Sequence, residues 1–155
     1  MAVAGLSTLG ITFGYGTEST AGNKPSTFTQ LTRINQIGAI TLENQQIDAS
    51  ALEDFITKNI AGRADTPGNV GVTINLTDDT KSEWETLITT YKALTGGKQM
   101  WFEIIIPNMT ESYFFIAQPP QEIPSPEMGQ NALLTVEITL TIVDVKAFDT
   151  KVSFS

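Results

Sequence analysis

The stretch from Asn131 to Val145 alternates apolar and polar side chains over most of its length. The apolar positions are Leu134, Val136, Ile138, Leu140 and Ile142, and the polar positions between them are Thr135, Glu137, Thr139 and Thr141. Because successive side chains of a β-strand point to opposite faces, this pattern predicts one long strand with an apolar face and a threonine-rich face. We expect the apolar face to lie in a core and the polar face to contact water. A sheet shared between copies of the chain would satisfy the strand edges, so the pattern favours assembly over chemistry.

The composition excludes several classes of function. The chain has 155 residues, a length typical of one domain, and contains no cysteine and no histidine. Thiol catalysis, disulfides and cysteine metal sites are therefore excluded, as are the usual general base and the commonest zinc ligand. No catalytic constellation is present, so we expect no enzymatic activity and no cofactor. The net charge of −8 disfavours tight binding of nucleic-acid phosphates.

Membrane insertion is not predicted either. No apolar run approaches the ~20 residues that a transmembrane helix needs. The first 16 residues lack a basic start followed by a compact apolar block, so we do not predict a signal peptide. The absence of cysteine fits a reducing cytosol.

Several further segments have the pattern of strands. They are Ile11–Tyr15, Leu31–Glu43, Val70–Leu76, Met100–Ile106 and Tyr113–Ala117. The short polar spacer between the last two suits a hairpin. Many strands with one inserted helix predict a mainly β fold, a β-sandwich or barrel.

One helix is predicted between residues 79 and 94. Its apolar residues recur at helical spacing: Trp84, Leu87, Ile88, Tyr91 and Leu94. Asp78 and Asp79 are placed to cap its N-terminus, and Gly96 and Gly97 to end it. We expect the helix to pack on the outer face of the sheet.

Two segments are predicted to extend from a single domain spanning residues 1–155. Residues 1–29 are rich in small residues and suggest a flexible N-terminal arm, although Ile11–Tyr15 alternates within it. Residues 44–69 are the least regular part and suggest an interaction loop, although Ser50–Ile60 has the spacing of a short helix.

The remaining motifs are weak. Gly14-Tyr15-Gly16 is a fragment of a glycine-rich loop, but no third glycine follows at the spacing of a dinucleotide site. Glu137 is the one charge on the threonine face and has no partner for acid–base work. Arg33 and Arg63, the two arginines, are either ordinary surface residues or bridges between copies.

The segment from Ile47 onward resembles part of the major tail tube proteins of long-tailed, siphovirus-type bacteriophages. The shared pattern is Ile47-Asp48, then Phe55-Ile56, then Ile60-Ala61-Gly62, followed by the alternating strand from Val70 to Leu76. The helix and the long last strand also lie where that family has them, and the resemblance covers about residues 35–145. The turn at residues 66–69 departs from the aspartate-rich turn usual in the family.

The resemblance implies a structural subunit of a phage tail. Such proteins form hexameric rings that stack into a hollow tube, which conducts the viral genome into the host. Each copy gives strands to a continuous barrel that lines the channel, so the channel-facing candidates are Thr135, Glu137, Thr139 and Thr141. The loop and the terminal arms contact neighbouring subunits or rings, so the intersubunit candidates are Glu53, Asp54, Arg63, Asp65, Pro67 and Gly68.

The resemblance also implies partners and a location. The partners are further copies of the chain, other tail proteins such as the tape measure and tail terminator, and passing DNA that is contacted weakly and without sequence specificity. No membrane partner is implied. The location is the virion tail, assembled in the cytoplasm of the bacterial host.

Two alternatives stay open. Type VI secretion and tailocin tube proteins share the fold, so the chain fits either device. A stand-alone carbohydrate-binding β-sandwich is the other alternative, and it needs an exposed aromatic platform, for which the candidates are Trp101, Tyr113 and Phe114.

Overall fold

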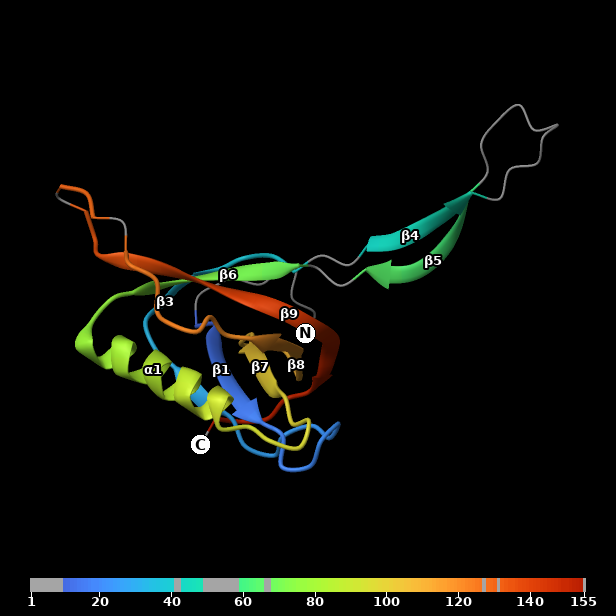
Figure 1. Cartoon of the computed structure of the whole chain (residues 1–155), viewed down its shortest axis with the longest axis horizontal. Helices are drawn as coiled ribbons and strands as arrows, with labels where there is room; N and C mark the ends of the chain where they lie inside the picture. Colours follow the sequence, from blue (N-terminus) through green and yellow to red (C-terminus); the bar gives the residue numbers. More distant parts are fainter. Residues whose placement is uncertain are drawn as a thin grey trace.

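The computed structural model describes residues 10–40, 68–126, 128–130 and 132–154 in full, and the backbone alone for 43–48 and 59–65. Within these residues it contains strands and one α-helix (Figure 1). In chain order they are β1 (Thr12–Thr17), β2 (Thr29–Leu31), β3 (Ile34–Ile37), β4 (Glu43–Asp48), β5 (Asn59–Asp65), β6 (Asn69–Asn75), α1 (Asp78–Lys92), β7 (Met100–Ile105), β8 (Glu111–Gln118) and β9 (Thr135–Thr150). The mainly β class with one helix, expected from the sequence, is confirmed.

Seven of the strands form one antiparallel sheet in the order β2-β1-β7-β8-β9-β6-β3. Strand β9 is 16 residues long and pairs twice. Its first part, Thr135–Thr141, pairs with β6, and its second part, Thr141–Thr150, pairs with β8. One long strand therefore belongs to both halves of the sheet.

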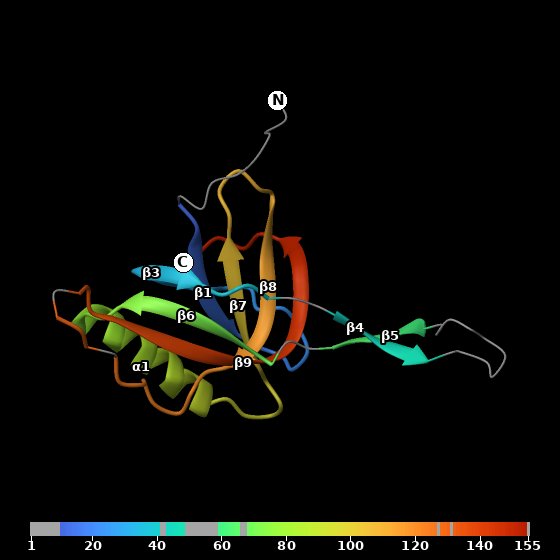
Figure 2. The same cartoon turned by 90° about the horizontal axis from the view of Figure 1, so that it is seen from above.

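The sheet folds over on itself where β9 passes from β6 to β8. The β8–β9 ladder shifts register twice, and Ala147 in β9 has a positive φ of 59°. Such bulges bend and twist a strand. We call β3, β6 and Thr135–Thr141 the front half-sheet, and β2, β1, β7, β8 and the rest of β9 the back half-sheet. Helix α1 and the back half-sheet both lie beneath the front half-sheet (Figures 1 and 2).

The core lies between these layers. In β9, Val136, Ile138, Leu140 and Ile142 are buried, as the alternation predicted, and they pack with the buried residues of β6. Leu134, which we expected to face the core, precedes the strand and is 42% exposed, so that part of the prediction is wrong. The back half-sheet contributes the stacked rings of Phe13, Phe102 and Phe115.

Helix α1 packs into this core through Trp84, Leu87 and Ile88, as predicted, with Tyr91 half-buried at its edge. Its N-cap is Thr77 and not the aspartates that the sequence suggested. The Thr77 hydroxyl accepts a hydrogen bond from the Thr80 N–H, and the Thr80 hydroxyl accepts one from the Thr77 N–H. Asp78 and Asp79 lie in the first turn, where their charge favours the helix dipole.

A second, smaller core covers the other side of the back half-sheet. It contains Phe28, Trp101, Phe114 and Ile116, with Val152 and Phe154 packed against it. Gly14 lies beneath Phe154, and a Cβ on this glycine would overlap the phenylalanine ring. The glycine-rich fragment around Tyr15 therefore belongs to strand β1, where it allows close packing, and is not a phosphate loop.

The hairpin β4–β5 differs from the expected interaction loop. The two strands pair antiparallel, with Ile47 opposite Ile60, in a sheet separate from the main one. The hairpin extends away from the rest of the molecule (Figures 1 and 2). Much of the segment expected to be irregular over 44–69 is thus regular strand. The short helix expected over 50–60 falls mostly outside the described residues, and its last two residues lie in β5.

Part of the N-terminal arm expected over residues 1–29 is regular strand instead. Thr12–Thr17 form strand β1, which pairs with β2 on one side and β7 on the other, in agreement with the alternation at Ile11–Tyr15. Residues 1–9 lie outside the described residues.

The two faces of β9 give a matched pair of substitutions. Ile138 is 0% exposed, so Ile138→Asp places an unpaired carboxylate in the core, which costs several kcal/mol, and we expect no folded protein. Thr139 is exposed on the opposite face, so the free energy of unfolding of Thr139→Asp should lie within about 0.5 kcal/mol of that of the parent. Urea denaturation followed by circular dichroism measures both. Equal stability of the two variants would contradict the assignment of the faces.

Trp84 tests the packing of the helix. Its side chain is 0% exposed between α1 and the sheet, so Trp84→Ala should lower the free energy of unfolding by about 3–5 kcal/mol. Thermal unfolding provides the measurement, with Lys92→Ala on the exposed side of the same helix as the control. A Trp84→Ala variant as stable as the parent would show that the helix is not held by this residue.

Candidate assembly surface

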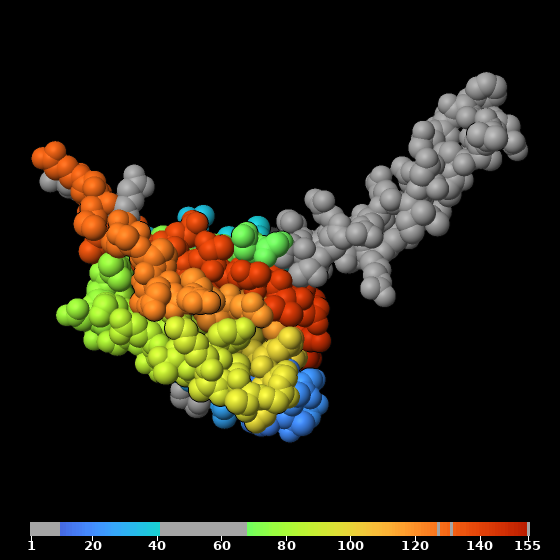
Figure 3. Space-filling model, viewed as in Figure 1, coloured from blue at the N-terminus to red at the C-terminus, as the bar shows by residue number. Residues whose placement is uncertain are grey.

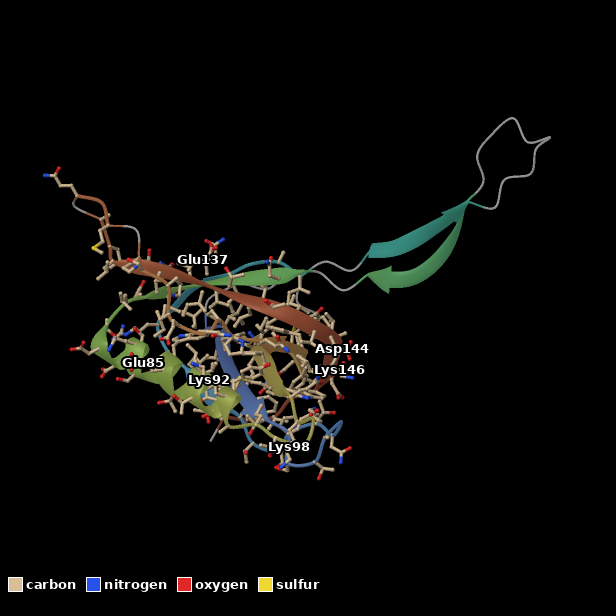
Figure 4. The ribbon with its side chains drawn as sticks, viewed as in Figure 1. Glu85, Lys92, Lys98, Glu137, Asp144 and Lys146 are labelled. Atoms are coloured by element: carbon tan, nitrogen blue, oxygen red, sulfur yellow. The ribbon has the colours of Figure 1, made fainter. Side chains whose placement is uncertain are left out.

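The outer face of the front half-sheet is polar and nearly uncharged. Glu137, Thr139 and Thr141 are exposed on it and Thr135 is half-buried, so the structure brings the four channel-facing candidates together on one face. On β6, Thr73 lies opposite Glu137. The sequences of β3, β6 and Thr135–Thr141 contain one charged residue, Glu137, which points away from the core in Figure 4.

Gly71 makes room for the Glu137 side chain. A Cβ on this glycine would lie 3.0 Å from the carboxyl carbon of Glu137, so the acidic side chain lies across the neighbouring strand. Beside it, the Asn35 side-chain amide donates a hydrogen bond of 3.3 Å to Oδ1 of Asn75. Amide, hydroxyl and carboxylate groups thus cover this face within the three strands. The nearest described cation along the chain is Arg33, which is exposed directly before β3, and its carbonyl accepts a hydrogen bond of 3.0 Å from the Asn75 N–H.

One edge of the front half-sheet is formed by the first part of β9. The Leu76 N–H donates to the Leu134 carbonyl at 3.0 Å, and the Ile142 N–H donates to the Gly68 carbonyl at 3.2 Å. In an antiparallel ladder such bonded residues recur at every second position, so the even-numbered residues of β9 bond to β6. The backbone groups of Thr135, Glu137 and Thr139 therefore point the other way.

No described strand pairs with β9 on that other side before Thr141, where β8 begins to pair. Strand β3 forms the opposite edge and, among the described strands, pairs only with β6. In the described part of the chain the front half-sheet therefore has two open edges, one at each side. Open edges can accept a strand from another chain, and proteins rarely leave them exposed without a purpose.

The intersubunit candidates are less fully described. The backbones of Arg63 and Asp65 lie in β5. Gly68 is exposed just before β6, and its carbonyl joins the β6–β9 ladder as described above. Glu53, Asp54 and Pro67 lie outside the described residues, so their assignment as contacts stays a prediction.

Two buried carboxylates were missed in the sequence. Glu18 is 3% exposed and accepts hydrogen bonds from Trp101 Nε1 at 2.9 Å and from the Gln99 N–H at 2.8 Å. Burial opposes its ionisation, but these hydrogen bonds prevail and hold the pKa of Glu18 below its ordinary value. This carboxylate ties the end of β1 to the start of β7.

Glu103, in strand β7, is the second buried carboxylate, and its side chain is 0% exposed. Its Oε2 accepts the Val152 N–H at 3.0 Å, which holds the segment after β9 against the back half-sheet. Burial raises the pKa of Glu103, and the hydrogen bond from Val152 offsets this only in part. A glutamate inside the apolar run Met100–Ile105 was the signal in the sequence. Glu18 and Glu103 each accept hydrogen bonds that join separate segments of the chain.

The aromatic platform of a carbohydrate-binding module is not formed by its candidates. Trp101 is 5% exposed and Phe114 is 0% exposed, both within the second core. Tyr113 is half-buried and packs edge-on against Phe148, with ring centroids 5.1 Å apart.

The described part of the chain also lacks two further kinds of site. No group of three or more acidic side chains there is arranged to hold a metal ion. No helix among these residues has the length and apolar character to cross a membrane.

Comparison with known proteins shows which solved structures have a similar fold. No protein-family model matches the sequence, and no curated protein does. The structure is similar to a chain of the anti-feeding prophage baseplate, solved by cryo-EM with six-fold symmetry, with a TM-score of 0.58 and 14% identity over 94% of this chain and 96% of that one. It is also similar to a chain of the tail of an empty GTA particle with C6 symmetry, with a TM-score of 0.56 and 13% identity over 91% and 95%. Components of phage-tail-like particles therefore share this fold.

Glu103 gives a prediction for the pH dependence of stability. Because its pKa is raised in the folded state, protonated Glu103 stabilises the fold. This contribution is complete when the pH is below the ordinary pKa of 4.5 and is lost as the pH rises through the raised pKa. Glu103→Gln keeps an oxygen for the Val152 N–H without the buried charge. We expect this variant to be more stable than the parent at about pH 7, and the difference to disappear near pH 4, in urea denaturation at both pH values.

Glu18→Gln is the matched control. The lowered pKa of Glu18 means that its contribution is present above the ordinary value and is lost as the pH falls through the lowered pKa. This variant should therefore be less stable than the parent at neutral pH, by about 1.5–3 kcal/mol. The same sign of change for both variants would contradict the assigned environments.

Proposed function

We propose that this chain is a structural subunit of the tail tube of a phage or a phage-tail-like particle. Hexameric rings of the chain stack into a hollow tube, and the front half-sheet of each copy lines the channel. The observation that carries this proposal is a polar, nearly uncharged sheet face with an open edge on each side. Rotation about a ring axis would place the β9 edge of one copy beside the β3 edge of the next, which satisfies both.

The chemistry of the face suits a conduit for DNA. Cationic side chains would hold the phosphate backbone by releasing its counterions, which would slow transport. The front half-sheet carries threonine and asparagine side chains and Glu137, so it would contact passing DNA weakly and without sequence preference. The C6 symmetry in the descriptions of both structural neighbours supports a hexameric ring.

Contacts between rings are assigned to the hairpin β4–β5 and the residues around it. The hairpin extends beyond the body of one subunit (Figure 1), so it can reach a neighbouring ring. The candidates Glu53, Asp54, Arg63, Asp65, Pro67 and Gly68 belong to this part of the chain. In this proposal, the further partners of the chain are a tape measure protein inside the tube and a terminator protein at its end. The chain would be located in the virion tail.

A baseplate ring is the second candidate. One of the two neighbours is a baseplate chain, and a protein of that kind would form a single ring without stacking. The two candidates differ in the object that the purified protein forms. Long tubes support the tail tube, whereas isolated rings support the baseplate.

Thr139→Pro tests the ring. The Thr139 N–H points to the open β9 edge, so proline there removes a hydrogen bond to the neighbouring copy and none within the subunit. We expect the parent protein to form rings or tubes in negative-stain electron microscopy, and the variant to stay a folded monomer in size-exclusion chromatography.

Thr139→Val is the control, because it keeps the N–H and should assemble like the parent. Normal tubes from Thr139→Pro would show that this edge does not join subunits. A parent protein that stays monomeric under all assembly conditions would overturn the proposed function.

A further inference from the structure

The two open edges of the front half-sheet present their backbone groups in different ways. Along β9, the N–H and C=O groups that point away from β6 belong to Thr135, Glu137 and Thr139, as described above. The side chains of these residues lie on the outer face of the half-sheet, where Glu137 and Thr139 are exposed. At the β9 edge, the residues that can bond to another strand therefore carry outward-facing side chains.

The β3 edge has the opposite pattern. The Gly38 N–H donates to the Gly71 carbonyl at 2.8 Å, and Gln36, two residues earlier, lies opposite Thr73. Residues that bond to β6 alternate with residues that do not, so Gln36 bonds to β6 and the backbone groups of Ile37 point to the edge. The Ile37 side chain is half-buried and packs against the core.

The bulge in β3 preserves this pattern. The register shifts between Ile34 and Gln36, so Asn35 is an extra residue in the strand. Before the bulge, the Asn75 N–H donates to the Arg33 carbonyl, so the backbone groups of Ile34 again point to the edge. Ile34 is half-buried against the core, whereas Asn35 and Gln36 are both exposed. At the β3 edge, the residues that can bond to another strand therefore carry inward-facing side chains.

Two strands can join one sheet only if their side chains fall on matching faces. In an antiparallel ladder, two residues that exchange hydrogen bonds lie directly opposite each other, with their side chains on the same face. In a parallel ladder, a residue bonds instead to the two residues that flank its opposite neighbour, and the side chains of those two lie on the other face. The β9 and β3 edges therefore match as a parallel pair and not as an antiparallel pair.

The directions of the strands lead to the same result. Strands β3 and β9 each pair antiparallel with β6, so they run the same way, on either side of β6 in Figure 2. Rotation about a ring axis does not reverse a strand within the ring, so β3 of the next copy still runs the same way as β9. Figure 3 views the molecule toward the β9 edge, and orange-red atoms of β9 form part of the surface in that view.

We propose that β9 of one copy and β3 of the next copy form a parallel ladder. This inference rests on the proposed function, which joins these two edges but does not set their direction. One residue of β9 would lie opposite the bulge, with its N–H donating to the Ile34 carbonyl and its carbonyl accepting from the Ile37 N–H. Its side chain would lie beside Asn35 and Gln36, so the polar outer face would continue from one copy to the next.

Mixed cysteine variants test the direction, since the natural chain has no cysteine. On β3 and just before it, the variants are Gln36→Cys and Arg33→Cys, both at exposed positions. On β9, the variants are Thr135→Cys, Glu137→Cys, Thr139→Cys and Thr141→Cys. Each variant of the first pair is mixed with each β9 variant under assembly conditions with a mild oxidant, and disulfide-linked dimers are measured on non-reducing gels. Because each copy carries one thiol, every such dimer reports a contact between copies.

The best-crosslinked β9 position should depend on which β3 thiol is used. Arg33 bonds to Asn75 and Gln36 lies opposite Thr73, so the two thiols are two ladder positions apart. In a parallel joint, we expect the best β9 position to move by two residues toward the C-terminus when the thiol moves from Arg33 to Gln36. Since a disulfide needs Cβ atoms about 4 Å apart, that position should give roughly tenfold more dimer than the others.

Lys98→Cys mixed with each β9 variant is the matched control, because Lys98 is exposed in the turn between α1 and β7, far from β3 (Figure 4). These mixtures should give background dimer only, and dimer equal to that of the β3 variants would overturn the inference.

Three further outcomes separate the inference from the proposed function. A shift of the best β9 position toward the N-terminus would indicate an antiparallel joint, which overturns the inference and leaves the proposed function standing. Rings without a crosslink at any of these pairs would also overturn the inference alone, because another segment would then occupy one of the edges. Mixtures that form neither rings nor crosslinks would overturn both.

Discussion

The pairing of β9 with both β6 and β8 is the interaction on which the rest of the structure depends. Without it no hydrogen bonds between strands would join the front half-sheet to the back half-sheet. The residues of β9 that bond to β6 are also those whose side chains enter the core. Hydrogen bonding and hydrophobic burial therefore reinforce each other in a single strand.

The geometry of β9 also separates the backbone groups that form hydrogen bonds within the subunit from those that remain unpaired. Side chains alternate along β9, so the apolar residues lie in the core and the threonines lie on the outer face. Backbone groups also alternate, so those of one set of residues bond to β6 and those of the other set point to an open edge. Among the described residues, the apolar side chains of β9 are buried, whereas two strand edges of the front half-sheet are unpaired. We interpret this pattern as a subunit that folds by itself and finishes its bonding in an assembly.

Much of the sheet could be predicted because strand periodicity is a local signal. The runs that became β1, β6, β7, β8 and β9 were each identified from alternation or from β-prone apolar stretches. The helix was also predicted, but its cap was not, because both Thr77 and the following aspartates suit that position and only the backbone geometry separates them. Leu134 was misassigned because alternation alone does not show where a strand begins.

The missed features depend on contacts between distant parts of the chain. The hairpin β4–β5 has little apolar alternation, so its pairing is not visible in either strand alone. The open edges follow from the order of strands in the sheet, which periodicity does not give. The alternation of the long strand and the resemblance to tail tube proteins both led to the assembly hypothesis, and the two structural neighbours share the fold that the resemblance implies.

The position of β9 in the chain also bears on biosynthesis. This strand leaves the ribosome after every other strand of the sheet, yet it joins β6 to β8. Until it emerges, the nascent chain holds two incomplete sheets with apolar faces in water, a state that is prone to aggregation. Folding of the sheet must therefore wait until β9 has emerged, and pairing between segments so far apart in the chain is slow. A chaperone that shields β6 and β8 during that interval would lower the risk of aggregation.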